Sequence, residues 1–267
     1  MSWMTAKTTN ISEEPMNVTN NSLTRSRPWK MAMGLAVCMA GGLLLAVDQP
    51  PQAQPAAAAH SAVVPEPKQP GGEPDGIVQV ANLVYAGTKS STCFSDHFLI
   101  DAEKASSIST SRRFHSVKLG SEELFEFPLV IMTGEGGFDL PDVERHNLRK
   151  FVEQGGLLLA SAGCSSPDWD KSFRAEMAQI FPDHPLKALS MDHPLFHTVY
   201  DVTQLNGLHQ TPRPLEAISM GDRVGVIYSV DGLNDTSHTT GCCCCGGNEI
   251  TNCNQINVNI LAYALLY

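Results

Sequence analysis

From residue 76 onward, apolar runs typical of buried strands alternate with amphipathic segments typical of helices. We expect strands at IVQVANLVYAG, FHSVKLG, FPLVIMTG and GLLLASA, which are residues 77–87, 114–120, 127–134 and 156–162. The stretch LEAISMGDRVGVIYS predicts a hairpin that turns at Gly221 and Asp222. Continuously apolar strands separated by helices predict a mostly parallel, doubly wound sheet covered on both faces, which is a three-layer α/β fold.

Helices are expected between these strands and at the end of the chain. Their ranges are 95–109, 141–156, 165–181 and 256–267. Ser95 and Ser166 are the expected N-caps of the first and the third helix. The apolar positions predict two buried stripes, Val143, Leu148, Phe151 and Val152 in the second helix and Trp169, Phe173, Met177 and Ile180 in the third.

The first 75 residues differ in composition from the rest of the chain. Arg25, Arg27 and Lys30 precede an uncharged, mostly apolar run, a pattern typical of a membrane anchor or a cleaved export signal. The expected organisation is a disordered segment 1–30, a membrane-spanning or signal helix 31–47, a Pro/Ala-rich linker 48–75 and one α/β domain 76–267. The basic flank places that domain outside the cytoplasm, either anchored in the cell membrane or exported.

The charge balance restricts the class of partner. The formal net charge is -10, and no run of Lys or Arg occurs in the domain, so we expect no binding to nucleic acid. The sequence indicates one partner, the membrane, which residues 31–47 would contact. The sequence does not identify a protein partner.

Reactive side chains follow four of the expected strands. Cys93 and His97 follow the first, Glu135 follows PLVIM, Cys164 follows LLLASA, and Asp231 and His238 follow RVGVIYS. Because the carboxyl ends of parallel strands meet at one edge of a sheet, we expect these loops to converge there.

Cys164 is the candidate nucleophile at this edge. It lies in a tight turn between a strand and a helix N-terminus, where the helix dipole favours a thiolate. Glu135 is a candidate acid in the neighbouring loop, whose glycines Gly134, Gly136 and Gly137 could present backbone N–H groups to an oxyanion or cofactor. The alternative is a half-buried cysteine with a packing role.

Four consecutive cysteines follow the last expected strand, between Gly241 and Gly246. We expect the run to supply thiolates to zinc or iron, with disulfide formation and simple packing as alternatives. Side chains alternate in an extended run, so two of the four would face a common ion. The candidate metal ligands are Cys242, Cys243, Cys244, Cys245, His238, Cys253, Cys93 and His97.

Four motifs occur in the same order as in a known family. They are FPLVIMTGEGGFDLPDVERHNLRKFVEQGGLLLASAGCSSPDWDKSFRAEMAQIFP, DHPLF, GDRVGVIYSVDGLND and INVNILAYALLY. Over about residues 77–267 the chain resembles the bacterial domain of unknown function family 4159. The resemblance implies the class I glutamine amidotransferase-like fold, which is related to the flavodoxin-like arrangement.

This chain departs from the family's usual pattern in two places. Glu135 stands where that pattern has His, and Ser161 and Ala162 stand where it has acidic residues. The turn AGCSS around Cys164 lacks the second glycine of the amidotransferase Gly-x-Cys-x-Gly turn, so glutaminase activity is not expected. We therefore expect a membrane-tethered, metal-binding domain, with a Cys164-centred hydrolase or transferase and a non-catalytic envelope interaction module as alternatives.

Overall fold

The computed structural model describes residues 76–90, 92–242 and 246–267. The predicted segments 1–30, 31–47 and 48–75 lie outside the described residues, as do Cys243, Cys244 and Cys245. Among the residues that are described, no helix has both the length and the apolar character needed to cross a membrane.

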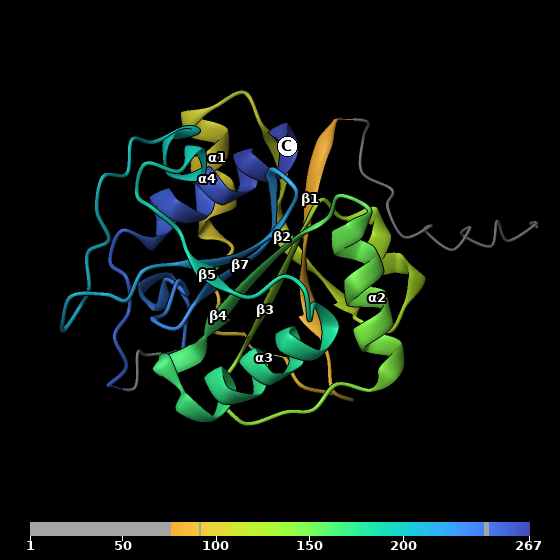
Figure 1. The fold of residues 1–267 in the computed structure, drawn as a ribbon. Helices are drawn as coiled ribbons and strands as arrows, with labels where there is room; N and C mark the ends of the chain where they lie inside the picture. The colour runs from red at the N-terminus through yellow and green to blue at the C-terminus, as the bar shows by residue number, and fades with distance from the viewer. Residues whose placement is uncertain (1–75, 91, 243–245) are drawn as a thin grey trace, which may run out of the picture. The chain divides into compact units, whose positions relative to one another are not determined.

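A seven-stranded sheet in the order β2-β1-β3-β4-β7-β6-β5 forms the centre of the domain (Figure 1). Five strands run parallel to one another, namely β2 (Ser109–Lys118), β1 (Ile77–Val84), β3 (Leu129–Gly134), β4 (Leu157–Ala162) and β7 (Arg223–Ser229). The last two strands, β6 (Glu216–Met220) and β5 (Lys187–Ala188), are antiparallel. The predicted mostly parallel sheet and the predicted hairpin between β6 and β7 are therefore confirmed.

Helices cover both faces of the sheet. Helices α1 (His97–Ala105) and α4 (Cys253–Leu266) lie on one face, and α2 (Asp142–Glu153) and α3 (Pro167–Ile180) lie on the other (Figure 1). Short 3₁₀ turns occupy Glu122–Glu126, Gly163–Ser165, Pro194–His197 and Thr236–His238. Successive residues of β3 and β4 contribute to opposite hydrophobic clusters, which is why these central strands are buried almost throughout.

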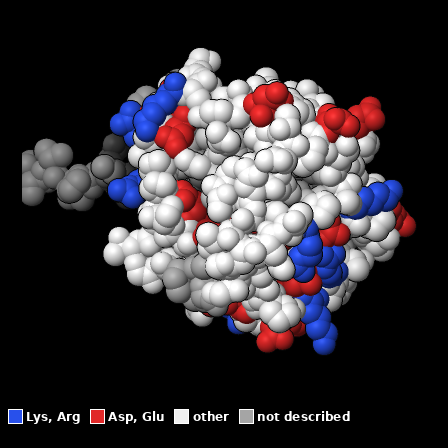
Figure 2. Space-filling view, turned by 90° about the vertical axis from the view of Figure 1, so that its left-hand side faces the viewer, with Lys and Arg blue, Asp and Glu red and all other residues white. Residues whose placement is uncertain are grey.

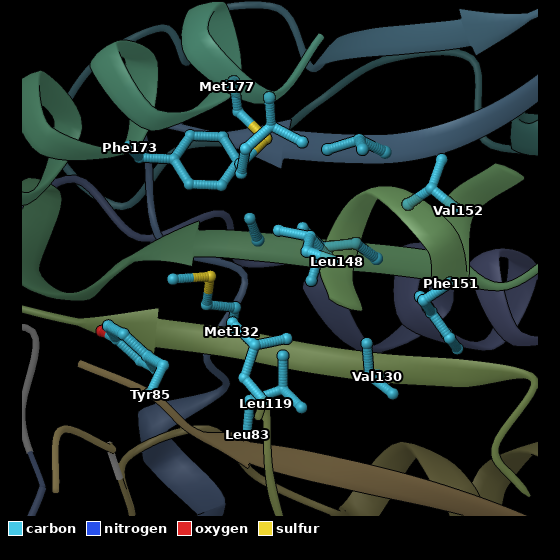
Figure 3. Close-up of a cluster of buried hydrophobic side chains, with 14 of the residues drawn as sticks. Leu83, Tyr85, Leu119, Val130, Met132, Leu148, Phe151, Val152, Phe173 and Met177 are labelled. Carbon is cyan, nitrogen blue, oxygen red and sulfur yellow. The ribbon is translucent and has the colours of Figure 1, made fainter. Parts of the chain in front are cut away.

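The cluster beneath α2 and α3 is shown in Figure 3. It includes Leu148 of α2, Phe173 of α3, and Val130 and Met132 of β3. Trp169, also in this cluster, is fully buried and stacks on Phe173 with ring centroids 5.1 Å apart. The predicted inner face of α3 is therefore confirmed, and the Ser166 side chain accepts a hydrogen bond from the Trp169 N–H as an N-cap should.

Some predicted boundaries and one predicted core residue are wrong. Helix α1 begins at His97 rather than at residue 95, and Ser95 is not its N-cap, although its Oγ accepts a hydrogen bond from the His97 N–H at 3.1 Å. Strand β2 begins five residues earlier than predicted, and α4 begins three residues earlier, at Cys253. Val143 is 55% exposed, because the inner positions of the first two turns of α2 are taken by Glu144, Asn147 and Leu148.

Charged side chains of both signs are scattered over the surface in Figure 2, with few charges in the middle of that face. Part of the charge forms local ion pairs rather than a patch of one sign. Arg145 on α2, for example, contacts Asp139, Asp142 and the buried Glu176 of α3 at 2.7–3.1 Å. Hydrogen bonding to Glu176 raises the pKa of Arg145, so this cation ties the two helices together at every working pH.

We expect Tyr85→Phe to lower the free energy of unfolding by about 1–3 kcal/mol. The Tyr85 hydroxyl accepts a hydrogen bond from Trp169 Nε1 at 2.7 Å and donates one to the Thr133 carbonyl at 3.0 Å. Removing the Tyr85 hydroxyl takes this acceptor away from the buried indole N–H of Trp169. Urea unfolding measures the change, and Tyr267→Phe, at an exposed position, is the matched control. Equal losses for the two variants would contradict the assignment.

Candidate metal centre at the carboxyl edge of the sheet

Strands β1, β3, β4 and β7 are consecutive neighbours in the sheet and run in the same direction. Their carboxyl ends therefore lie along one edge, which confirms the predicted convergence of the loops that follow them. Cys93 and His97 arrive there from β1, Glu135 from β3, Cys164 from β4 and His238 from β7.

Two histidines from distant parts of the chain meet at this edge. The imidazole rings of His97 and His238 stack with their centroids 4.0 Å apart and their planes within 5° of parallel. His97 is the first residue of α1, and His238 is the last residue of the 3₁₀ turn after β7. Both were predicted as metal ligands, and the structure brings them together.

Asp235 joins the two histidines and was not among the predicted ligands. Its carboxylate oxygens lie 2.7 and 2.8 Å from His238 Nδ1, and the residue is buried. One ligand atom from each of His97, Asp235 and His238 lies within 4.8 Å of the other two. The signal in the sequence was the spacing Asp-x-x-His, which places a carboxylate and an imidazole on the same turn.

Each ring has a carboxylate next to its Nδ1 atom. Asp235 contacts Nδ1 of His238, and Asp101 Oδ2 lies 3.4 Å from Nδ1 of His97. At His97, a carboxylate beside Nδ1 holds the proton on that nitrogen and leaves Nε2 for a metal, which is the usual environment of a metal-ligating histidine. Asp235 is itself a candidate ligand, so it would exchange its contact with His238 Nδ1 for the ion. Two imidazoles and one carboxylate fit zinc or ferrous iron.

The distances between the three ligand atoms can be compared with those in a metal-bound site. Two ligands of one zinc ion lie at most about 4.2 Å apart, twice a bond of roughly 2.1 Å. The 4.8 Å limit within which the three ligand atoms lie is thus close to that maximum. The two imidazoles lie face to face, so at least one ring must turn before nitrogen lone pairs of both can point at one ion.

The loop that carries Asp235 and His238 is fixed to the sheet by polar contacts. The buried Ser161 of β4 accepts a hydrogen bond from the Leu233 N–H and donates one to Asn234 Oδ1, both at 2.9 Å. Glu249 accepts hydrogen bonds from the N–H and the hydroxyl of Thr236 at 2.7 and 2.6 Å. These contacts hold Asp235 in a left-handed conformation, with φ of 53°, that few non-glycine residues adopt.

Cys93 and Cys242 were predicted as metal ligands, and the structure instead joins them in a disulfide with Cα atoms 5.5 Å apart. A sulfur in a disulfide is not a thiolate, so these two residues do not serve as ligands in this state. Cys93 also lies in the loop before α1, so it does not share a helix face with His97. The disulfide alternative for the cysteine-rich loop therefore holds for Cys242.

Cys253 is the first residue of α4, and it is buried, with 3% of its surface exposed. Burial raises the pKa of its thiol to about 12, and the charge of Asp235 acts in the same direction. The thiol is therefore neutral at ordinary pH, and its sulfur does not belong to the group formed by His97, Asp235 and His238.

Cys164 occupies the sharp turn predicted for a nucleophile. Cys164 and Ser165 both have φ of 51°, a left-handed conformation that is strained for residues with a Cβ atom. The Cys164 thiol donates a hydrogen bond of 3.5 Å to Glu135 Oε1, so the two predicted catalytic residues are in contact. Gly247 packs on this turn so closely that a Cβ there would lie 2.4 Å from the Cys164 carbonyl carbon.

A cavity of about 10 Å³, the size of one water molecule, lies beside Cys164. It is lined by Cys164, Ser165, Gly232, Asn234, Thr236, Gly247, Asn248 and Glu249. The predicted cofactor-binding glycines are not among the lining residues. Gly134 is required by packing, because a Cβ there would lie 2.5 Å from the Tyr85 hydroxyl, whereas Gly136 and Gly137 have room for one.

The model of one protein family, described as Domain of unknown function (DUF4159), matches residues 82–265. The chain belongs to this family. The comparison with curated proteins found no match. The match spans His97, Cys164, Asp235 and His238, so both groups of side chains belong to the DUF4159 domain itself. The wider placement among amidotransferase-like folds stays a prediction.

We expect the double variant Cys93→Ser, Cys242→Ser of this DUF4159 protein to be less stable by about 2–4 kcal/mol. The disulfide joins positions 149 residues apart, and closing so long a loop restricts the unfolded chain strongly. Urea unfolding without reductant measures the loss. A reducing agent should destabilise the wild type and leave the double variant unchanged; equal sensitivity of the two proteins would contradict the assignment.

Proposed function

We propose that this DUF4159 domain binds one divalent transition-metal ion, zinc or ferrous iron, through His97, Asp235 and His238. The observation that carries the proposal is the grouping of three ligand atoms within 4.8 Å, drawn from two segments that are distant in the sequence. The carboxylate of Asp101 beside Nδ1 of His97 supports it, because it leaves Nε2 of that ring for the ion.

Three protein ligands leave at least one coordination position for water or a substrate, as in catalytic rather than structural zinc sites. His238 is 47% exposed, so such a position can face solvent. A polar pocket of about 320 Å³ lies beside His238, with Arg113 on its wall. The proposed function is therefore ligand binding at an open metal centre, whose reaction, if it has one, would use a metal-bound water or a metal-bound substrate.

We further propose that the domain works outside the cytoplasm, tethered or exported through residues 31–47. The Cys93–Cys242 disulfide supports this location, because disulfides persist mainly in oxidising compartments. A reporter enzyme fused after Tyr267 should then be active outside the cytoplasm, whereas activity inside the cytoplasm would contradict the proposed topology.

We expect the purified full-length protein to bind zinc with one ion per chain, and His97→Ala, Asp235→Asn and His238→Ala each to weaken binding by at least about tenfold. Isothermal titration with zinc, followed by metal analysis, measures the effect. His146→Ala, an exposed histidine on α2, is the matched control and should leave the affinity unchanged.

A second set of variants separates this site from the predicted thiolate site. Replacing Cys243, Cys244 and Cys245 together by Ser should leave one ion per chain bound if the His/Asp/His group holds it. Loss of zinc in that variant, with full binding in His238→Ala, would overturn the proposed centre and favour the thiolate ligands.

The second candidate function is a Cys164-centred hydrolase or transferase, favoured by the strained turn and the contact with Glu135. A carboxylate beside the thiol can accept its proton as a nucleophilic attack begins. We expect iodoacetamide to alkylate Cys164 in the native protein, and Glu135→Gln to change the pH dependence of the rate. Peptide mapping identifies the alkylated residue, and Cys164→Ser is the control that should not be alkylated there. If Cys164 reacts at the rate it has in the unfolded chain, and Glu135→Gln does not change that rate, this role is contradicted.

A further inference from the structure

We propose that the Cys93–Cys242 disulfide is a redox switch for the metal centre, so that its reduction weakens metal binding. The inference rests on the proposed function, since it concerns the regulation of the same site. It is carried by the position of the disulfide: Cys93 precedes His97 by four residues, and Cys242 follows His238 by four residues.

The two histidines arrive from strands that are not neighbours. Strands β3 and β4 lie between β1 and β7, so the segments that follow β1 and β7 start about three strand spacings, or roughly 14 Å, apart. The segments must therefore cross the edge of the sheet to bring the imidazoles into contact. The disulfide is the covalent link between them.

His97 has supports that do not depend on the disulfide. It begins α1, and the Asn254 side chain of α4 donates to Asp101 and lies 3.4 Å from His97 Nδ1. The Ser95 N–H donates a 2.8 Å hydrogen bond to the Asn234 carbonyl. We therefore expect His97 to keep its place when the disulfide is broken.

His238 is held differently on its two sides. Upstream, Thr236 is fixed to Glu249. Downstream, the Cys242 N–H donates to the Thr239 carbonyl, a contact within the loop itself, and the disulfide then ties Cys242 to the segment before α1. Breaking the disulfide removes the covalent hold on the downstream side, so the ion must itself order the loop, and ordering costs affinity.

The chemistry is an ordinary thiol–disulfide exchange. A dithiol reductant attacks one sulfur and forms a mixed disulfide; its second thiol then closes its own disulfide and releases both cysteines. The protein's sulfur–sulfur bond gains two electrons and two protons, and the reductant loses the same number. Both cysteines are half-buried, so a small reductant can reach them.

The test compares zinc affinity in three states of the full-length chain. These are the oxidised protein, the protein reduced with a phosphine that binds zinc weakly, and the variant Cys93→Ser, Cys242→Ser. We expect the oxidised protein to bind zinc about tenfold or more tightly than the other two, as is typical when groups that orient ligands are lost. The double variant should not respond to the reductant.

Several outcomes would overturn the switch. Equal affinity in all states would do so while leaving the proposed metal centre intact, whereas absence of binding in every state would remove both proposals. Tighter binding after reduction, with a thiolate-to-metal absorption band when cobalt replaces zinc, would show that Cys93 and Cys242 become ligands themselves. The double variant would lose that band.

Amide hydrogen exchange separates loosening of the loop from unfolding of the domain. Reduction should raise exchange in residues 236–242 and leave strands β3 and β4 protected. Loss of protection throughout the sheet would mean that the disulfide acts on global stability alone, and would also overturn the switch.

Discussion

The parallel alignment of β1, β3, β4 and β7 is the constraint on which both candidate sites depend. It directs four loops to one edge of the sheet, although the residues they carry are up to about 150 positions apart in the chain. The alignment is itself a consequence of burial: strands covered by helices on both faces must be apolar on both faces, and helical crossovers then make neighbouring strands parallel. The polar and reactive side chains therefore lie in the loops at the strand ends.

The side chains of the proposed metal centre suit a cation. Asp235 is buried next to His238, and a buried carboxylate is costly unless it is paired or hydrogen-bonded. His97 stacks directly on His238. A metal ion would neutralise the carboxylate and take neutral imidazoles as its other ligands.

The sequence predicted the sheet, its helices and the shared edge, since these follow from local periodicity. It also predicted His97 and His238 as ligands. The pairing of Cys93 with Cys242 was not predictable, because several cysteines satisfy the same composition and their partners depend on how loops cross the edge. Asp235 was missed because its role depends on a left-handed backbone that distant residues hold in place.

The loop after β7 connects the two candidate sites physically. Its residues Asn234 and Thr236 line the cavity beside Cys164, and Asp235 and His238 from the same loop belong to the proposed metal centre. Glu249 contacts Thr236 and lines that cavity as well. A metal ion that orders this loop therefore also fixes one wall of the cavity at the thiol. If both groups act, they act on one another through this loop, and a change at either should be measurable at the other.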